Sequence, residues 1–372
     1  MRIRLKQVLF PQQKSKIKAG EGKTQGKYKF FTSSPIQSKF LDEANYDFPS
    51  LIFGTGGNAS VHFCDEPFST STDCLVMYGR SRIELESIYN YLKSNIDILE
   101  NGFKGAGLKH ISKDYILAIE IDLPCESIQL EFLQKNRIVD ELIEAKQTQL
   151  RLNDDLVKSR FIEMFGDPIR NTMNWPICEL SECIEFLTSG SRGWAQYFTD
   201  EGEYFITIKN VKNCRITLDD VQHIIPPNNA EAKRTKVKEG DLLISITADL
   251  GRTGVVTKVI AEHGGYINQH LTCIRLDQKT ARPLYVAYYM ESEAGKCQFQ
   301  SKNQSAVKAG LNFNAINSLR FMLPPIELQD SFIEFIEQTD KSKFEIQQSL
   351  EKLETLKKAL MQKYFSNKLV KK

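Results

Sequence analysis

The chain contains one segment twice. Residues 123–165 recur without gaps at 323–365, 200 positions later. The matched residues of the first copy are Leu123, Pro124, Gln129, Phe132, Asp140, Gln147, Leu150, Leu156, Lys158 and Phe165. Each copy follows a longer segment that differs from its counterpart. A repeat of this kind indicates one structural unit used twice, here to hold two different domains at a fixed distance.

Both copies have the spacing of long helices. Apolar residues recur at three- and four-residue steps, and prolines at 124 and 324 mark the starts. In the second copy, the apolar residues form a narrow stripe of the kind that pairs with one partner helix. The pattern predicts helices within 123–167 and 323–366. The residues expected to pair the helices or contact a partner are Leu142, Leu150, Leu156, Ile346, Leu353, Leu356 and Leu360.

A helix of about 40 residues is ~60 Å long and cannot bury its apolar face alone. We therefore expect the two helices to pair antiparallel, with the domains at opposite ends and an approximate internal two-fold symmetry. The alternative is that each helix packs only on its own domain.

The segments 1–122 and 168–322 have the pattern of short strands separated by turns. Predicted strands include 204–208, 241–247, 254–260 and 271–276. Leu51-Ile52-Phe53-Gly54 resembles Leu242-Leu243-Ile244-Ser245, and 106–108 resembles 309–311, which suggests diverged copies of one fold. The predicted class is α+β, with two α/β domains built on curved β-sheets and joined by antiparallel coiled-coil helices. Residues 367–372 form a basic tail.

The net charge of +2 conceals a basic N-terminal segment, because residues 1–40 contain ten Lys and Arg but only one acidic residue, Glu21. A second cluster spans Lys233 to Lys238. Polyanion binding explains both clusters, since basic side chains release condensed counterions from phosphates; a solvated surface is the alternative.

The eight cysteines contain no CxxC pair, which predicts free thiols in a reducing cytoplasm. No apolar run approaches the ~20 residues of a membrane span, so a membrane role is excluded.

Two glycine-rich segments imitate nucleotide-binding loops without matching them. The segment 19–24 has Ile17 where a P-loop needs glycine, and the segment 53–58 continues as a strand rather than a helix. The glycines at 54, 56 and 57 can serve close approach to a ligand or a tight hairpin.

The segment 188–213 interleaves basic, amide and aromatic residues, which are the types that read base edges. Polar loop residues that merely face solvent are the alternative. Catalytic signals are absent: Pro226-Pro227 and Pro324-Pro325 lack the residues of an amino-methyltransferase motif, and the five histidines lack metal-ligand spacing. The sequence therefore predicts a binding protein without catalytic, cofactor or metal residues.

These motifs together resemble the specificity subunits of type I restriction-modification systems. The resemblance rests on Met164-Phe165-Gly166-Asp167-Pro168 followed by Trp175, on Gly190-Ser191-Arg192-Gly193-Trp194, on 30–34, 52–59 and 68–73, and on Leu-Pro-Pro-Ile-Glu-Leu-Gln at 323–329. The first helix departs from the pattern, because Cys125 replaces the second proline.

The resemblance implies two target recognition domains, each reading half of a bipartite double-stranded DNA sequence, with the helices fixing the gap. It also implies two modification subunits that bring S-adenosylmethionine and methylate adenine. Restriction subunits, where the system has them, bring ATP- and Mg-dependent translocation and cleavage. The candidate DNA contacts are Lys23, Lys27, Lys29, Ser33, Ser34, Gly54, Thr55, Gly56, Gly57, Asn58, Ser189, Ser191, Arg192, Trp194, Lys209, Asn210, Arg252, Asn268 and Gln269. The alternatives are a coiled-coil adaptor that does not contact DNA and a self-contained methyltransferase.

Overall fold

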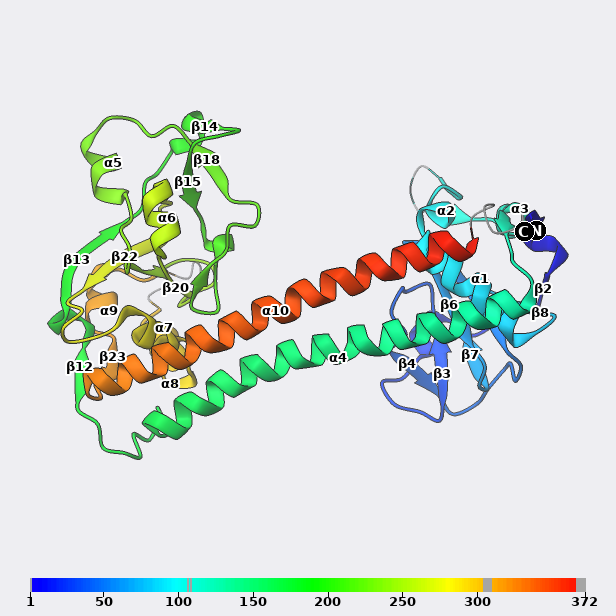
Figure 1. The fold of residues 1–372 in the computed structure, drawn as a ribbon, viewed down its shortest axis with the longest axis horizontal. Coiled ribbons are helices and arrows are strands. Elements are labelled where there is room, and N and C mark those ends of the chain that lie inside the picture. The colour runs from blue at the N-terminus through cyan, green and yellow to red at the C-terminus, as the bar shows by residue number, and fades with distance from the viewer. Residues whose placement is uncertain (1, 106, 108, 304–309, 366–372) are drawn as a thin grey trace. The chain divides into compact units, whose positions relative to one another are not determined.

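The computed structural model describes residues 2–105, 107, 109–303 and 310–365 (Figure 1). The chain divides into two compact units. Unit 1 comprises residues 1–150 and 345–372, and unit 2 comprises residues 151–344. Each of the two long helices thus contributes one segment to each unit. The predicted basic tail, 367–372, lies outside the described residues.

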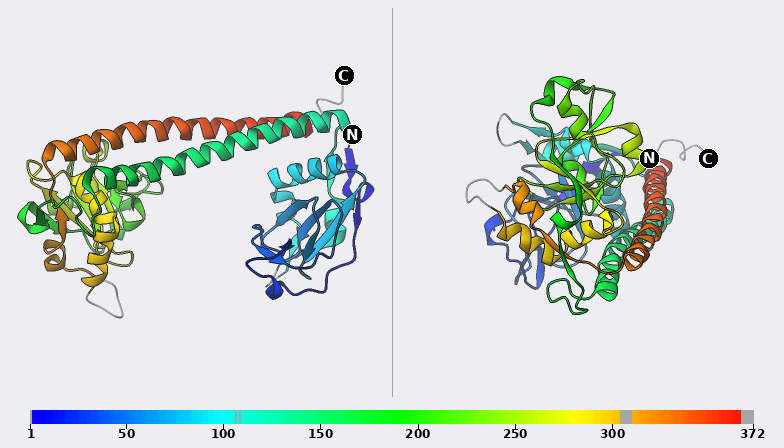
Figure 2. Two further views of the ribbon diagram at one scale, coloured as in Figure 1. Left: turned by 90° about the horizontal axis from the view of Figure 1, so that it is seen from below. Right: turned by 90° about the vertical axis from the view of Figure 1, so that its left-hand side faces the viewer.

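Unit 1 is built on a four-stranded antiparallel sheet of order β2-β8-β5-β6, which Figure 2 shows as a curved sheet. A second sheet, of order β4-β3-β7, contains the parallel pair β3 and β7. The strands are β1 (Arg2–Arg4), β2 (Leu9–Pro11), β3 (Tyr28–Phe31), β4 (Lys39–Leu41), β5 (Ser50–Gly54), β6 (Ser60–Cys64), β7 (Phe68–Thr70), β8 (Cys74–Gly79), β9 (Phe103–Lys104), β10 (His110–Ile111) and β11 (Glu120–Asp122). The short helices are α1 (Arg82–Ser94), α2 (Asp97–Glu100) and α3 (Lys113–Ala118).

Unit 2 repeats this plan with a sheet of order β13-β22-β19-β20 and a second sheet of order β14-β18-β15-β21. Its strands are β12 (Ile177–Glu179), β13 (Ile184–Ser189), β14 (Phe198–Thr199), β15 (Glu203–Ile206), β16 (Val211–Lys212), β17 (Arg215–Ile216), β18 (Gln222–Ile224), β19 (Leu242–Ser245), β20 (Thr253–Val255), β21 (Gly265–Ile267), β22 (Leu271–Leu276) and β23 (Arg320–Met322). Its short helices are α5 (Ala230–Thr235), α6 (Lys258–His263), α7 (Pro283–Glu291), α8 (Glu293–Ser301) and α9 (Phe313–Asn317).

The two units share one topology. In both main sheets, the third position in the strand order is taken by the segment whose sequences resemble each other, 51–54 in β5 and 242–245 in β19. In both units, the second sheet contains one parallel pair of strands. The second pair of similar segments, 106–108 and 309–311, lies partly outside the described residues. Beside it, the amide of Ile111 donates to the Thr55 carbonyl and the amide of Leu311 donates to that of Ile246. The prediction of two diverged copies of one fold is confirmed.

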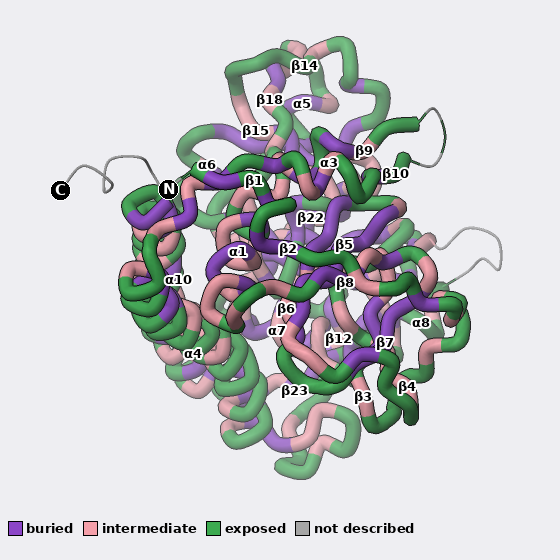
Figure 3. The backbone as a smooth tube through the Cα atoms, turned by 90° about the vertical axis from the view of Figure 1, so that its right-hand side faces the viewer, coloured by how far each residue is buried: buried purple, intermediate pink, exposed green. Residues whose placement is uncertain are grey.

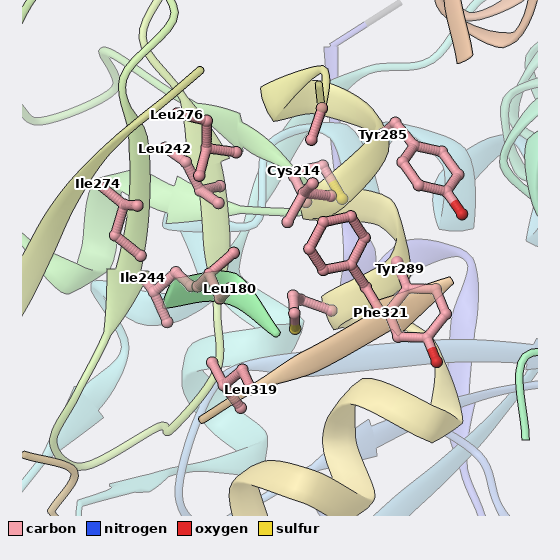
Figure 4. Packing of buried hydrophobic residues seen from close by; sticks show 14 of the residues in the cluster. Leu180, Cys214, Leu242, Ile244, Ile274, Leu276, Tyr285, Tyr289, Leu319 and Phe321 are labelled. Carbon is pink, nitrogen blue, oxygen red and sulfur yellow. The ribbon is translucent and has the colours of Figure 1, made fainter. Parts of the chain in front are cut away.

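The main core of unit 2 lies between its sheet and helix α7. Figure 4 shows Leu242 and Ile274 of the sheet directed toward Cys214, Tyr285 and Phe321, and all five are buried. The Tyr285 hydroxyl donates to the Met322 carbonyl at 2.8 Å, which satisfies its polar end. Such a core makes the sheet a rigid support for the loops at its ends.

One predicted strand of unit 2 was too long. The pattern suggested a strand over 254–260, but β20 ends at Val255 and helix α6 begins at Lys258. Ile260 is buried by the helix, whereas Val259 points out and is 66% exposed. Gly264, at φ 93°, ends the helix. The β-branched residues gave a strand signal because the helix is too short to show its period.

The long helices are α4 (Glu126–Phe165) and α10 (Ile326–Phe365), so both begin three residues later than their predicted segments. In unit 1, the start of α4 and the end of α10 lie together in one core, with Phe132 and Phe365 both buried. In unit 2, Phe165 of α4 and Phe332 of α10 share the core in the same way. Within each unit the helices therefore pack antiparallel as well as on the domain.

The buried faces of α4 and α10 follow a seven-residue repeat. The buried or half-buried positions include 129, 136, 143, 150, 157 and 164 in α4, and the same positions plus 200 in α10. Most of the remaining helix surface is exposed (Figure 3). This period is that of a coiled coil.

The helix-pairing prediction is only partly correct. Leu150, Ile346, Leu353 and Leu360 are half-buried on this face. In contrast, Leu142, Leu156 and Leu356 are 45%, 49% and 47% exposed, so they do not lie on the buried face, and contact with a partner stays a prediction for them. Each precedes a buried or half-buried position of this face by one residue, which turns its side chain by about 100°.

Candidate nucleic-acid interface

The loops of unit 1 that carry candidate DNA contacts meet at one end of its main sheet. Gly54 pairs with Ser60 and with Cys74 at this end, and the turn 55–58 joins β5 to β6. The Asp73 carbonyl accepts from the Thr55 hydroxyl at 2.9 Å and from the Ser33 hydroxyl at 2.8 Å. We call this group of loops, residues 32–34, 55–58, 73 and 110, the loop edge of unit 1.

The glycines at this edge have different tasks. A Cβ on Gly54 would lie 2.9 Å from the Cα of Ser33, so this glycine permits close packing of two backbone segments. Gly57, at φ 81°, has open space around it and forms the turn. Gly57 and Asn58 are exposed, whereas Gly54 and Thr55 are buried. Only the tip of the hairpin is therefore accessible to a ligand.

Two histidines that were not among the candidates also lie at this edge. The His62 ring donates from Nε2 to the Ser34 carbonyl at 2.9 Å, and His110 Nδ1 lies 3.0 Å from the Thr55 carbonyl. Burial lowers the pKa of His62. Their sequence signal was weak, because a single histidine in a strand has no characteristic spacing.

The three candidate lysines lie away from this edge. Lys29 is in β3, whose far end leads to Ser33, and Lys27 precedes that strand. Lys23 forms an ion pair with Asp42 at 2.7 Å, and the hydrogen bond to this carboxylate raises the pKa of Lys23. Lys29 forms an ion pair with Glu66 at 3.3 Å. Part of the basic charge counted in the sequence is therefore matched locally.

The loops of unit 2 gather at the equivalent end of its sheet. Ser189 pairs with Thr272, Ser245 with Leu271 and Ile244 with Thr253 at this end. We call residues 189–193, 247–252 and 268–270 the loop edge of unit 2. It brings together the candidates Ser189, Arg192, Arg252, Asn268 and Gln269, all exposed or half-buried.

Contacts among these loops fix their conformation. The amide of Ser191 donates to the Ile267 carbonyl at 2.9 Å, and the amide of Gln269 donates to the Ser191 carbonyl at 2.9 Å. The Arg192 Nε donates to Gln269 Oε1, and Arg252 pairs with Asp249. His270 and Thr247, which were not predicted, join the cluster through a 2.7 Å contact. Gln269 and His270 are adjacent in the sequence. Thr247, in contrast, meets His270 only because the folded sheet brings their loops together.

Three candidates of unit 2 are buried, so the prediction that their side chains contact DNA was wrong. Trp194 is 4% exposed, packs with Tyr197, Phe205 and Tyr266 and donates to Glu231. The Asn210 side chain accepts from the amide of Thr207, and the Ser191 hydroxyl donates to the Ile267 carbonyl. These polar and aromatic types complete a core or a turn, where sequence alone cannot distinguish them from exposed base readers. Lys209, beside Asn210, is exposed.

Arg234 of α5 forms hydrogen bonds with the end of β13, the strand that leads into this loop edge. Its Nη1 donates to the Thr188 hydroxyl and to the Ser189 carbonyl, the latter at 2.6 Å. Arg234 belongs to the basic cluster between Lys233 and Lys238. These two hydrogen bonds give this member of the cluster a structural role.

The opposite end of each sheet leads to the long helices. In unit 1, the Leu5 amide donates to the Ile119 carbonyl at 2.9 Å, directly before β11 and α4. In unit 2, Arg282 forms a bidentate pair with Asp330 of α10, at 2.5 and 2.9 Å. These connections to the helices therefore lie at the ends of the sheets opposite to the loop edges.

All eight cysteines are free thiols, as predicted, and only Cys125 and Cys297 are exposed. Among the described residues, no group of three His, Cys, Asp or Glu side chains is placed to hold a metal ion. Within the same residues, no helix is long and apolar enough to cross a membrane.

The fold and these edges define a class of protein: two related α/β binding domains, each with a polar loop edge, on a repeated helical support. The chain belongs to the family described as the type I restriction modification DNA specificity domain, which matches residues 1–152 and 174–358. The resemblance predicted from the sequence is confirmed. The chain is accordingly a type I restriction-modification specificity subunit, a DNA-recognition component.

The similarity to known proteins extends over most of the chain. The type I restriction enzyme EcoBI specificity subunit of Escherichia coli is 21% identical over 370 residues, covering 91% of this chain and 77% of the relative. The S subunit of a type I restriction-modification system from M. genitalium has a TM-score of 0.61 at 15% identity, with 99% and 96% of the two chains covered. A chain from a structure of type I restriction-modification complex assembly has a TM-score of 0.59 at 17% identity, with 98% and 97% covered. At these identities the solved structures support the fold.

Proposed function

We propose that each unit reads one half of a bipartite double-stranded DNA sequence through its loop edge, and that α4 and α10 set the unspecified gap. The observation that carries this proposal is the equivalence of the two edges. Both lie at the same end of the same sheet, away from the helices, and they differ in their exposed side chains. Two related supports with different tips suit an asymmetric target.

The catalytic chemistry belongs to partner subunits in this proposal. Two modification subunits dock on the chain, bring S-adenosylmethionine and methylate one adenine in each half-site. Restriction subunits, where present, bring ATP- and Mg-dependent translocation. The candidate DNA residues of this chain then position the DNA through phosphate contacts and read its sequence through base contacts.

The decisive experiment is single-molecule sequencing of DNA from a host that lacks other methylation and expresses this chain with its modification subunit. N6-methyladenine should appear in one bipartite motif. Replacement of residues 168–322 by the same region of another specificity subunit should change one half of the motif only. A genome without any modified motif would contradict the proposal.

The gap can be tested by removing residues 146–152 from α4 together with residues 345–351 from α10. Seven residues shorten a helix by about 10 Å and almost preserve its facing direction. The gap in the motif should shorten by about three base pairs, since B-DNA rises ~3.4 Å per pair. An unchanged gap in an active complex would remove the helices from this role.

Direct DNA contact separates this function from a coiled-coil adaptor. The complex with the modification subunits should bind a duplex carrying the motif, with affinity that falls as salt rises. Replacement of Lys27 and Lys209 by glutamine should reduce the salt slope without changing the motif, because lysine contacts to phosphate carry no sequence information. A complex that binds no duplex at any salt concentration would favour the adaptor.

A further inference from the structure

A chain of hydrogen-bonding side chains crosses the loop edge of unit 2 and ends on Arg192. Thr247 Oγ1 lies 2.7 Å from His270 Nδ1, and His270 Nε2 lies 3.3 Å from Gln269 Nε2. Gln269 Oε1 accepts from Arg192 Nε. Four side chains from three loops therefore determine where one exposed guanidinium lies.

The direction of each hydrogen bond follows from the arginine. A guanidinium can only donate, so Gln269 presents its oxygen to Arg192 and its amino group to His270. His270 Nε2 must then accept, which places the ring proton on Nδ1, where it donates to the Thr247 hydroxyl. All three contacts are satisfied by one arrangement with a neutral histidine.

The backbone beneath this chain is also fixed. The amides of Gly190 and Ser191 donate to the carbonyls of Leu271 and Ile267, at 3.1 and 2.9 Å. A Cβ on Gly190 would collide with the backbone of Asn268, so only glycine allows this approach. The next turn needs Gly193, at φ 73°. Arg192 thus extends from a loop that is attached to the loop of Gln269.

Arg192 differs from most of the other arginines of unit 2 in which of its nitrogens are occupied, and it shares its pattern with Arg170, which lies outside the loop edge and contacts Asp167 through Nε. Among the described residues, only the Nε of Arg192 has a partner, so both of its terminal nitrogens are free. By contrast, a terminal nitrogen of Arg252 is held by Asp249, and one of Arg234 by the Thr188 hydroxyl. Terminal nitrogens of further arginines are held by carboxylates, namely in Arg215, Arg275, Arg282 and Arg320.

We infer that Arg192 reads a guanine in the half-site of unit 2, with its two terminal nitrogens donating to O6 and N7 in the major groove. Guanine is the base that presents two adjacent acceptors there, whereas adenine presents one acceptor and one donor. An arginine held through Nε offers its two remaining donors end-on, which matches this pair. Gln269 and His270 are positioning residues, because they act on the base only through Arg192.

This inference rests on the proposed function and adds a base identity to one edge. It also distinguishes the units: in the described part of unit 1, the loop edge carries serine, threonine, asparagine, aspartate and histidine side chains but no arginine. Guanine recognition through a guanidinium is therefore assigned to the half-site that changes when residues 168–322 are replaced.

The test uses the complex of the full chain with its modification subunit. Methylation motifs are determined for the wild type, Arg192→Lys, Arg192→Ala and Gln269→Ala. The half-site of unit 2 should contain a guanine, and the Arg192 variants should lose about 10- to 100-fold of the discrimination against other bases at that position. The other positions of the motif should not change. Gln269→Ala should give a smaller loss at the same position, and Gln269→Glu should restore it because a carboxylate still accepts from Arg192 Nε.

Arg170→Lys is the matched control. Arg170 is exposed, lies in unit 2 outside the loop edge and also contacts its partner, Asp167, through Nε. Its motif should equal that of the wild type. A half-site without guanine, or an unchanged motif in both Arg192 variants, would overturn the inference while leaving the proposed function intact. Absence of any motif in the wild type would instead refute the proposed function.

A second measurement covers the case in which the Arg192 variants do not methylate at all. The wild-type complex is bound to a duplex whose guanine at this position is replaced by 7-deazaguanine, which lacks the N7 acceptor. Affinity should fall about 10-fold with the same salt slope. Equal affinity for both duplexes would overturn the inference without any variant protein.

Discussion

Phe132 of α4 and Phe365 of α10 meet edge to face, with ring centroids 5.1 Å apart and ring planes at 90°. Phe165 and Phe332 repeat this contact in unit 2, at 5.4 Å and 86°. The 200-residue repeat relates Phe132 to Phe332 and Phe165 to Phe365. Each copy of the helix therefore contributes its first phenylalanine to one unit and its last to the other, and the same contact closes both cores.

Alanine at Phe132 or Phe332 should each destabilise its own unit by about 3–5 kcal/mol, because both side chains are fully buried and an alanine leaves a cavity. Urea unfolding followed by circular dichroism measures the change. Leu142→Ala is the control, since Leu142 is 45% exposed and should alter stability by about 0.5 kcal/mol or less. A loss below about 1 kcal/mol in both phenylalanine variants would show that these contacts do not close the cores.

The sequence predicted the helices well because their signal is long. Forty-residue helices with a repeated pattern leave little ambiguity. Leu142, Leu156 and Leu356 were chosen by residue type, and they lie one residue outside the seven-residue phase of the buried face. The domains were predicted as a class only, because short strands gain their pairing from distant residues. Arg192 and Gln269 were found as types, but the partners that orient them, Thr247 and His270, meet only in the folded sheet.

Asp140 of α4 pairs with Lys357 of α10 within unit 1. The side chains are 44% and 28% exposed, so solvent screens the pair and its contribution should be about 0.5–1 kcal/mol. Asp140→Lys should cost more than this, since it places two ammonium groups together. Adding Lys357→Asp should recover most of the loss, and a double-mutant cycle of unfolding free energies measures the coupling. Additive effects of the two changes would contradict the pairing.

Cys125 stands where the second copy has Pro325, and the local geometry is the same. The Ile128 amide donates to the Cys125 carbonyl at 3.0 Å, and the Leu328 amide donates to the Pro325 carbonyl at 3.0 Å. Cys125→Pro should therefore fold normally. The shared hydrogen bond explains why the departure from the family pattern at Cys125 leaves the helix start unchanged.

Cys125 should also be the most reactive thiol of the chain. A contact with the Ser127 hydroxyl, at 3.3 Å, lowers the pKa of the exposed Cys125 thiol. Burial raises the pKa of Cys74 to about 11 and that of Cys183 to about 12, so these thiols should stay inert. A thiol-reactive dye at pH 7 should label Cys125 first and Cys297 second in the native chain. Ser127→Ala should slow the first phase, and rapid labelling of further cysteines would contradict the burial of the other six.

His62 should make the stability of unit 1 depend on pH. Burial lowers its pKa in the folded chain, so the folded state binds this proton less readily than the unfolded state. The stabilisation is complete above the unfolded pKa of about 6.5 and is lost as pH falls toward the folded pKa. His62→Gln retains a donor for the Ser34 carbonyl and cannot titrate, so its unfolding free energy should fall less between pH 7.5 and 5.5 than that of the wild type. Equal losses in the two proteins would place the pH dependence elsewhere, because His62 would then contribute no proton uptake on unfolding.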